Sequence, residues 1–264
     1  MMLKQCGRQE LMIPVVVLQT IAANLGSMLT PIGNPQNLYL YGLAGTGIGE
    51  FIMWLLPYTI VSALLLVISI LLIKNKNEII CIEDTDSEAA HNTSVPRVMA
   101  YSVLFILALL VVARVLTWYI LAAAVLITVL LLEKNVLTKA DYALLLTFIG
   151  FFIFTGNMGR VEPVAHFLAG IVNGRELEVG IITSQGISNV PAALLLSGFT
   201  DNIKNLSIGV NIGGLGTLIA SMASLISYKL YVNEVPEKKG KYFAVFTVYN
   251  IIFLVVLYVF TKLI

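Results

Sequence analysis

Long apolar runs separated by short polar segments make up most of this chain. Four runs contain few charged residues and predict membrane-spanning helices: residues 51–73, 98–132, 142–154 and 242–260. The first is long enough to cross the hydrocarbon core of a bilayer, which takes about 20 residues. The second is too long for one span and predicts two helices joined by a tight turn at Arg114, Thr117 and Trp118. The polar, amphipathic stretch 156–178 predicts a surface helix over 161–172.

Two further apolar runs are interrupted in their middles. In the first, Ser188-Asn189-Val190-Pro191 predicts a helix restart, with Asn189 as the cap and the proline in the first turn. In the second, Asn211 to Thr217 holds three glycines in seven residues. A break at membrane depth persists only where it lines a cavity or packs in protein. Two close breaks are typical of a transporter's binding site, whereas a proline kink and close packing of small residues remain the alternatives for each alone.

A second copy of the glycine-rich break lies near the N-terminus. Residues 24–34 align without gaps on residues 211–221, an offset of 187, with Asn, Gly, Thr and Ile at matched places. The apolar run 11–28 breaks here, because Pro31 and Pro35 cannot lie in an unbroken helix without losing backbone hydrogen bonds. This internal symmetry favours a transporter built from repeats.

Composition narrows the class of protein. Of the 264 residues, 58% are hydrophobic and 12% are charged, against about 25% charged in a typical soluble domain, so we expect a polytopic membrane protein. The net charge of +1 does not indicate a nucleic acid partner, and no basic cluster suggests one, so none is expected. Cys6 and Cys81 both lie in polar segments expected in the cytoplasm, where neither a disulfide nor a metal site is expected. The sequence has no pair of acidic residues at membrane depth and no His-Glu-x-x-His motif. An enzyme is therefore not expected, and neither is a cofactor.

Lysines and arginines in the loops predict the orientation, because they are enriched on the cytoplasmic side. Eleven would lie on one side: Lys4, Arg8, Lys74, Lys76, Arg97, Lys134, Lys139, Lys229, Lys238, Lys239 and Lys241. Five would lie on the other: Arg114, Arg160, Arg175, Lys204 and Lys262. The N-terminus is therefore expected in the cytoplasm and the C-terminus outside, in a cell (plasma or inner) membrane.

Three motifs resemble the ion transporter superfamily, which includes citrate-transporter-like permeases, arsenite-pump-type and sodium/proton-antiporter-type carriers, and divalent anion:sodium symporters. They are A-A-N-L-G-S-M-L-T-P-I-G-N-P-Q-N (22–37), I-S-N-V-P-A-A-L-L (187–195) and N-I-G-G-L-G-T (211–217). The resemblance implies two inverted repeats, each with scaffold helices, a re-entrant hairpin and an interrupted helix. It also implies a homodimer that moves its transport domain in an elevator fashion.

The fold class expected is therefore an all-α membrane protein with about six transmembrane segments and one re-entrant helical hairpin. Residues 1–74 would be the end of an incomplete first repeat, 75–97 a cytoplasmic linker, and 98–264 the second repeat. The hairpin tip that precedes Asn211 begins at Ser188, and the same spacing before Asn24 reaches residue 1. The first hairpin tip is therefore expected to be missing, so that the chain corresponds to the C-terminal portion of a permease.

The resemblance assigns substrate and ion binding to matched positions. In the second repeat these are Ser188, Asn189, Val190, Pro191, Asn211, Gly213, Gly214 and Thr217, and in the first Asn24, Gly26, Ser27, Thr30, Gly33, Asn34 and Asn37. Thr183, Ser184 and Gln185 precede the hairpin tip, where ion ligation and hydrogen bonding to helix carbonyls are both open. The tip reads Ser-Asn-Val-Pro, as in the arsenite and antiporter-like branches, and not Ser-Asn-Thr as in the symporters.

The function expected is secondary active transport of an anion, such as citrate, a dicarboxylate or an arsenite-like species, coupled to Na⁺ or H⁺. The positive end of the half-helix that starts at Val190 favours an anion. The carbonyls of 181–187 and 210–216 would suit a hard cation such as Na⁺. The alternatives are a Na⁺/H⁺ antiporter-like carrier and a non-transporting half-subunit or remnant.

Overall fold

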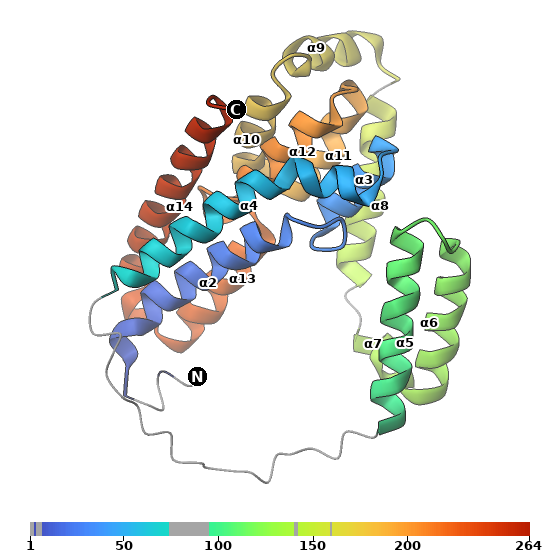
Figure 1. Ribbon diagram of the computed structural model, residues 1–264, viewed down its shortest axis with the longest axis horizontal. Helices are drawn as coiled ribbons and strands as arrows, with labels where there is room; N and C mark the ends of the chain where they lie inside the picture. The colour runs from blue at the N-terminus through green and yellow to red at the C-terminus, as the bar shows by residue number, and fades with distance from the viewer. Residues whose placement is uncertain (1–2, 4–6, 74–94, 140–141, 159) are drawn as a thin grey trace. The chain divides into compact units, whose positions relative to one another are not determined.

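The computed structural model describes residues 3, 7–73, 95–139, 142–158 and 160–264. Cys6, Cys81 and most of the linker expected at 75–97 lie outside these residues. The chain divides into two compact units, one of residues 1–80 with 150–264 and the other of residues 81–149. Within the described residues every regular element is helical (Figure 1), which confirms the all-α class.

The larger unit begins with an interrupted helix. A short 3₁₀ turn (η1, Gln9–Leu11) leads into α2 (Met12–Ser27), and after a break the chain continues as α3 (Pro35–Ala44) and α4 (Ile48–Leu71). Asn34 starts α3 because its side chain accepts a 2.9 Å hydrogen bond from the Asn37 amide, and Pro35 occupies the first turn, where no N–H is needed. The predicted break between 26 and 35 is confirmed.

The second half of this unit runs through a helical hairpin into another interrupted helix. Its elements are the last part of α8 (Tyr142–Met158), α9 (Glu162–Val172), α10 (Glu176–Ile187), α11 (Asn189–Leu196), η3 (Ser197–Phe199), α12 (Ile203–Ile212), η4 (Leu218–Ala220), α13 (Met222–Glu234), η5 (Pro236–Lys238) and α14 (Lys239–Thr261). The helix predicted over 161–172 is therefore α9.

The two interrupted helices correspond under the predicted offset. Adding 187 to Asn34 and Pro35, the cap and first residue of α3, gives Ser221 and Met222, the cap and first residue of α13. The contacts correspond as well: α2 packs on α13 and α3 packs on α12, and Figure 1 draws α2 beside α13. The segment after each break also matches, because α4 and α14 are both long apolar helices.

The hairpin is embedded in the core of this unit. Buried apolar residues from α3, α9, α11 and α12 form one cluster: Leu40, Val172, Ala192, Ala193, Leu196, Leu206 and Val210. Beside this cluster, α10 approaches α12 so closely that a Cβ on Gly209 would lie 2.5 Å from the Leu177 carbonyl oxygen. Glycine is therefore required there by the contact between two backbones.

The smaller unit is a helical pair with little interior. It contains α5 (Val95–Val112), α6 (Trp118–Leu132), α7 (Lys134–Lys139) and the start of α8, and α5 packs on α6. The predicted turn lies between them, with Arg114 in a left-handed conformation (φ 61°). Arg97 and Glu133 form an ion pair of 3.4 Å at the other end. Val129 is the one buried residue described in α5 and α6, so their apolar side chains face outward, as in a bilayer.

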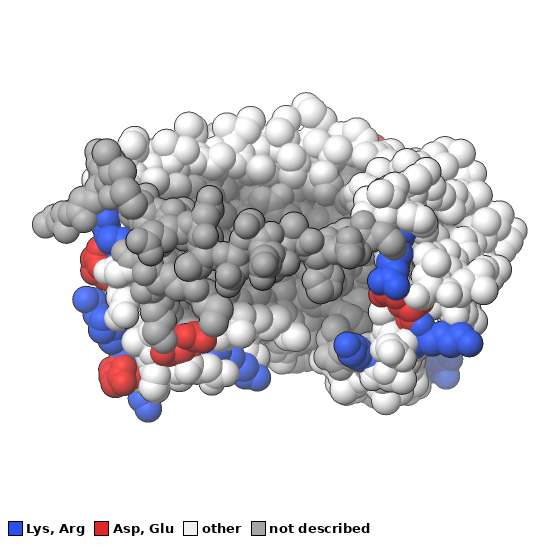
Figure 2. All heavy atoms as spheres, turned by 90° about the horizontal axis from the view of Figure 1, so that it is seen from below, with Lys and Arg blue, Asp and Glu red and all other residues white. Residues whose placement is uncertain are grey.

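Four of the described helices are long and apolar enough to cross a membrane: Gln9–Ser27, Ile48–Leu71, Val95–Val112 and Pro236–Thr261. Shorter apolar helices include Trp118–Leu132, Leu145–Met158 and Asn189–Phe199. The charged side chains visible in Figure 2 gather in small groups and leave broad uncharged areas. The molecule is a multi-pass membrane protein.

The contact between α10 and α12 makes a first prediction. Gly209→Ala should lower the free energy of unfolding by about 1–3 kcal/mol, because the added methyl must push two backbones apart. Gly42→Ala is the matched control, because a Cβ on Gly42, an exposed position of α3, meets nothing within 4 Å. Thermal unfolding in detergent measures both. Equal stability of the two variants would contradict the close packing.

Candidate functional site

The two helix breaks are joined through the side chain of Asn211, which is 2% exposed. Its Nδ2 donates to Asn37 Oδ1 (2.6 Å) and to the Ser207 carbonyl oxygen (2.8 Å). Its Oδ1 accepts from Asn34 Nδ2 (3.1 Å). An amide has two donors and one acceptor oxygen, and here all are in use. Asn211 therefore ties the end of α12 to the start of α3.

Asn24 makes the corresponding contacts from the other break. Its Nδ2 donates to Ser221 Oγ (2.9 Å) and more weakly to Ser224 Oγ (3.4 Å). Adding 187 to Asn24, Asn34 and Asn37 gives Asn211, Ser221 and Ser224, so each asparagine bonds the cap residues of the other repeat. Such reciprocal contacts are those that a two-fold relation between the repeats produces.

The first break is closed by its own polar groups. Asn37 Nδ2 donates to the carbonyl oxygens of Met28 (2.7 Å) and Thr30 (3.3 Å), and Ser27 Oγ donates to the Asn24 carbonyl oxygen (3.0 Å). A Cβ on Gly33 would lie 1.8 Å from the Ser27 carbonyl oxygen. This glycine is therefore required by the close return of the chain. The predicted residues of this break, Gly26 aside, come together around Asn34 and Asn37.

The hairpin tip is a single strained residue. Ser188 joins α10 to α11 with φ 74° and ψ 153°, a region that is essentially restricted to glycine and costs of order 1–3 kcal/mol. The prediction that Asn189 caps α11 is wrong. Because the turn at Ser188 is so sharp, the helix begins one residue earlier than expected, at Asn189, and no side chain caps it. Pro191 lies in the first turn, as predicted.

The Asn189 side chain instead lies against the second break. It is 7% exposed, and no described residue forms a hydrogen bond with its amide. Its Nδ2 lies 2.9 Å from the point that a Cβ on Gly214 would occupy. Gly214 thus leaves room for a buried amide whose donors and acceptor are unpaired within the described residues. Its donors and acceptor are therefore free to hydrogen-bond a ligand.

Gln185 supports the second break. Its Nε2 donates to the carbonyl oxygens of Gly213 (2.9 Å) and Leu215 (3.0 Å), and its Oε1 accepts from the Thr217 amide (2.9 Å). Thr217 Oγ1 returns a 3.1 Å hydrogen bond to the Gln185 carbonyl oxygen. Gly216 has φ 104°, and a Cβ there would lie 2.3 Å from Gln185 Oε1. Nε2 of Gln185 also lies 3.1 Å from the Ile181 carbonyl oxygen, so three of the carbonyls expected to face a cation accept from this glutamine.

The remaining predicted residues divide into two groups. Ser184 is fully buried and donates to the Gly180 carbonyl oxygen (2.7 Å), as the alternative of local hydrogen bonding expects. Val190 is buried in the first turn of α11. Thr183 is half-buried, and none of its hydrogen bonds within the described residues reaches a break. Gly26 is exposed, and a Cβ there would meet nothing within 4 Å.

Three polar side chains at the site were not predicted: Gln36, Ser221 and Ser224. Gln36 Nε2 lies 3.4 Å from Asn211 Oδ1. Extending the repeat alignment by three residues past 221 pairs Asn37 with Ser224 and would have found the serines. For Gln185 the sequence left ion ligation and hydrogen bonding to helix carbonyls both open, and its Nε2 lies 3.1 Å from the Ile181 carbonyl oxygen of its own helix. None of the side chains that hydrogen-bond within or between the two breaks is titratable, so the site is lined by neutral amides, hydroxyls and backbone groups.

Comparison with known proteins places the chain among transporters. The profile of a family described as "Citrate transporter" matches residues 1–205. The uncharacterized transporter MJ0456 of Methanocaldococcus jannaschii is 36% identical over 250 residues, which cover 94% of this chain and 66% of that protein. The inner membrane protein YbiR of Escherichia coli K12 is 28% identical over 230 residues, 82% of this chain and 58% of that protein. The chain thus spans less than two thirds of the length of these relatives.

The asparagine contacts make a second prediction. Asn211→Ala should cost about 1–3 kcal/mol of stability, because it leaves the buried amide of Asn37 and the half-buried amide of Asn34 without their partner. Asn24→Ala should cost less, about 1 kcal/mol or below, because Ser221 and Ser224 still bond each other (2.8 Å). Chemical unfolding in detergent measures both, and a double-mutant cycle of Asn37 with Asn211 isolates their coupling. A larger loss for Asn24→Ala would refute this account of the network.

Proposed function

The chain belongs to the citrate transporter family, and we propose that it carries the hairpin and interrupted helices of a secondary active transporter that moves a small anion with a cation. The observation that carries the proposal is the convergence of the hairpin tip with both helix breaks. Asn189 lies over Gly214, and Asn211 joins that break to Asn34 and Asn37. Broken helices that meet at one point are how such transporters form a binding site.

The donors at the tip favour an anion. The first turn of α11 presents backbone N–H groups and the positive end of the helix dipole. The unpaired amide of Asn189 adds a side-chain donor beside them. We propose a small oxygen-rich anion as the substrate, such as citrate, a dicarboxylate or an arsenite-like species.

The chemistry of the site favours Na⁺ over H⁺ as the coupling ion. A site without a fixed positive charge needs a cation to offset the charge of the anion. None of the side chains bonded within the breaks titrates, so no residue there can carry the proton. Hydroxyl, amide and carbonyl oxygens lie close to the C-terminal ends of α10 and α12, where broken helices hold Na⁺. Proton coupling, and with it an antiporter-like carrier, remains the alternative.

The two-fold relation between the repeats implies a second hairpin that completes the site. Gly213 has no room for a Cβ because α10 fills it, with Ser184 Oγ at 2.8 Å and Ile181 Cα at 2.9 Å. Its counterpart, Gly26, faces open space. A groove of about 410 Å³, lined by α2 and α13, lies on the corresponding side. We infer that a hairpin like α10–α11 covers it in the whole protein, from the same polypeptide or from another chain.

The movement proposed is of the elevator type, in a homodimer. The chain's two compact units suit such a movement, which needs one body that carries the site and another that stays in place. A subunit that does not transport is the second candidate, and it is favoured only by the open face at Gly26.

Uptake into liposomes tests the proposal. The whole protein should take up labelled citrate, succinate or arsenite when an inward Na⁺ gradient is imposed, and much less when choline replaces Na⁺. Asn189→Ala should reduce uptake at least about tenfold, while the free energy of unfolding changes by less than about 1 kcal/mol, because this amide has no bond to lose. Thr217→Val is the companion variant, and Asn135→Ala, an exposed position of α7, is the matched control.

The outcomes separate the alternatives. Normal uptake by both site variants would mean that the breaks are packing features. Equal uptake driven by a pH gradient in the absence of Na⁺ would show that the coupling ion is H⁺ and not Na⁺. The chain alone should show no gradient-driven uptake, and Gly26→Val should leave its stability unchanged but abolish uptake by the whole protein. Robust uptake by the chain alone would contradict the need for a second hairpin.

The orientation is a further prediction. With Cys6 and Cys81 replaced by serine, Asn173→Cys at the end of α9 should react with an impermeant thiol reagent in intact cells. Asn135→Cys should be shielded, because the lysines around α7 place it in the cytoplasm. The reverse labelling pattern would turn the hairpin toward the cytoplasm.

A further inference from the structure

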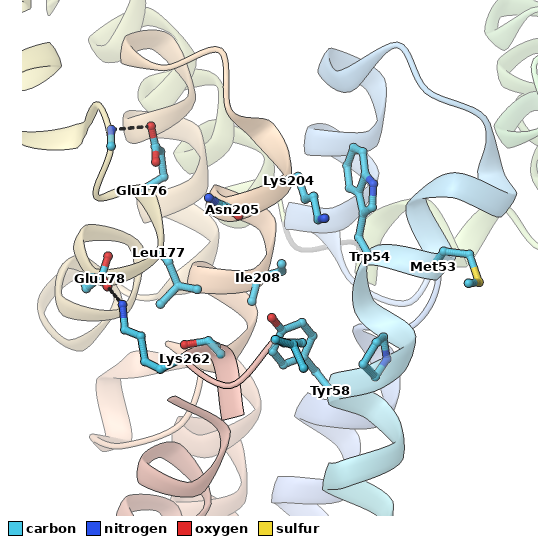
Figure 3. Close-up of a pocket in the computed structure, with 14 residues that line it drawn as sticks. Met53, Trp54, Tyr58, Glu176, Leu177, Glu178, Lys204, Asn205, Ile208 and Lys262 are labelled. Atoms are coloured by element: carbon cyan, nitrogen blue, oxygen red, sulfur yellow. Dashed lines mark hydrogen bonds and ion pairs between the residues drawn. The ribbon is translucent and has the colours of Figure 1, made fainter. Parts of the chain in front are cut away.

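A cavity of about 350 Å³ lies in the larger unit between α4, α10, α12 and α14 (Figure 3). No residue of the two helix breaks or of the hairpin tip lines it. Its walls come from the first half of α4, the segment just after α14, and the first turns of α10 and α12. Because α4 and α14 are candidate membrane spans, a cavity at their ends lies near the boundary between hydrocarbon and water.

Three of the four charged side chains of the cavity already have partners. Glu178 pairs with Lys262, and this bond lowers the pKa of Glu178 and raises that of Lys262, so both stay charged. Glu176, 4% exposed, accepts hydrogen bonds from the Gly174 amide (2.9 Å) and Thr200 Oγ1 (3.0 Å). Lys204 is exposed, and within the described residues it has no ion pair.

The available cation lies opposite the acidic groups. In Figure 3, Lys204 extends from α12 toward Trp54 on α4, while the Glu178–Lys262 pair lies on the other side of the cavity. A negatively charged ligand would thus meet Lys204 without facing the carboxylate of Glu178. Lysine and tryptophan are also the residues that gather where headgroups meet the bilayer core.

An apolar path leads away from the cavity along α4. Met53, which lines the cavity, is 64% exposed. Further exposed apolar side chains follow on α4 at helical spacing: Ile60, Leu64, Val67 and Leu71. Residues three, four or seven apart share one face of a helix. A ligand with its charged end at Lys204 can therefore lay an apolar tail along this stripe.

We propose that this cavity binds the headgroup of an anionic phospholipid, with phosphate oxygens at Lys204 and an acyl chain along the exposed stripe of α4. The ligand needs both a negative charge and an apolar tail, because the cavity joins a cation to a lipid-facing surface. A lipid in this cavity would contact α10 of the hairpin and the two long spans α4 and α14. It would therefore link the base of the hairpin to these spans. This inference rests on the membrane location and does not require the proposed transport.

Fluorescence quenching tests the proposal on the chain in detergent. Trp54 and Trp118 are its two tryptophans, so Trp118→Phe leaves Trp54 as the reporter. Phosphatidylglycerol with brominated acyl chains should quench Trp54 at lower concentration than brominated phosphatidylcholine. Lys204→Gln should weaken the apparent affinity about fivefold, the effect of one cation near a lipid surface, and should not change thermal stability. Lys229→Gln, an exposed lysine on α13, is the matched control.

The remaining outcomes overturn the proposal in different ways. Equal quenching by the two lipids would remove the requirement for negative charge. An unchanged affinity in Lys204→Gln, or an equal loss in Lys229→Gln, would remove Lys204 from the site. Displacement of phosphatidylglycerol by millimolar inorganic phosphate or glycerol phosphate would assign the cavity to a free anion, whereas the lipid should resist both.

Discussion

Backbone groups released by a helix break inside a membrane must find partners within the protein, and the rest of this structure depends on how they do so. Amide side chains supply several of the partners. Gln185 holds the carbonyls of Gly213 and Leu215, and Asn37 holds those of Met28 and Thr30. An unpaired buried group would cost several kilocalories per mole in hydrocarbon. These hydrogen bonds fix the chain at the two breaks, so that the breaks can hold binding groups in position.

The same constraint couples the two repeats. Asn211 takes its partners from α3, and Asn24 takes its partners from α13, so neither break can shift without changing the other. A ligand that contacts one break would therefore act on both, which is the physical requirement for binding substrate and cation together. The two repeats do not correspond at every position: the buried hydroxyl of Ser207, the counterpart of Thr20, has no hydrogen-bond partner among the described residues. Thr20 bonds Ser227, whose own counterpart is Leu40, a residue without a polar atom.

Sequence patterns predicted the elements well and the contacts between them only in part. Hydrophobic run lengths located the α5–α6 turn, and glycine and proline located both breaks, because these signals are local. The offset of 187 predicted the pairing of cap residues, since a repeat carries its contacts with it. The bonds of Gln185 to the second break were not predicted, because they depend on how closely α10 approaches a segment that is some thirty residues later in the chain. The prediction that Asn189 caps α11 was wrong for a related reason. Residue preference favoured Asn as the cap, but the turn geometry at Ser188 determines where the helix begins.

Ser188 shows how this geometry serves binding. Glycine would adopt φ 74° at little cost, and serine pays strain of order 1–3 kcal/mol there, yet its hydroxyl gains only a weak 3.5 Å contact with the Ala220 carbonyl oxygen. The strain is held by surrounding bonds, since Gln185 in the last turn of α10 is fixed to the second break at both ends of its amide. The result is a turn that starts α11 at Asn189 and leaves the first-turn N–H groups without a side-chain cap. The side-chain oxygen of a capping residue would have occupied this position, so the strained tip leaves the positive end of α11 accessible, as the proposed anion site requires.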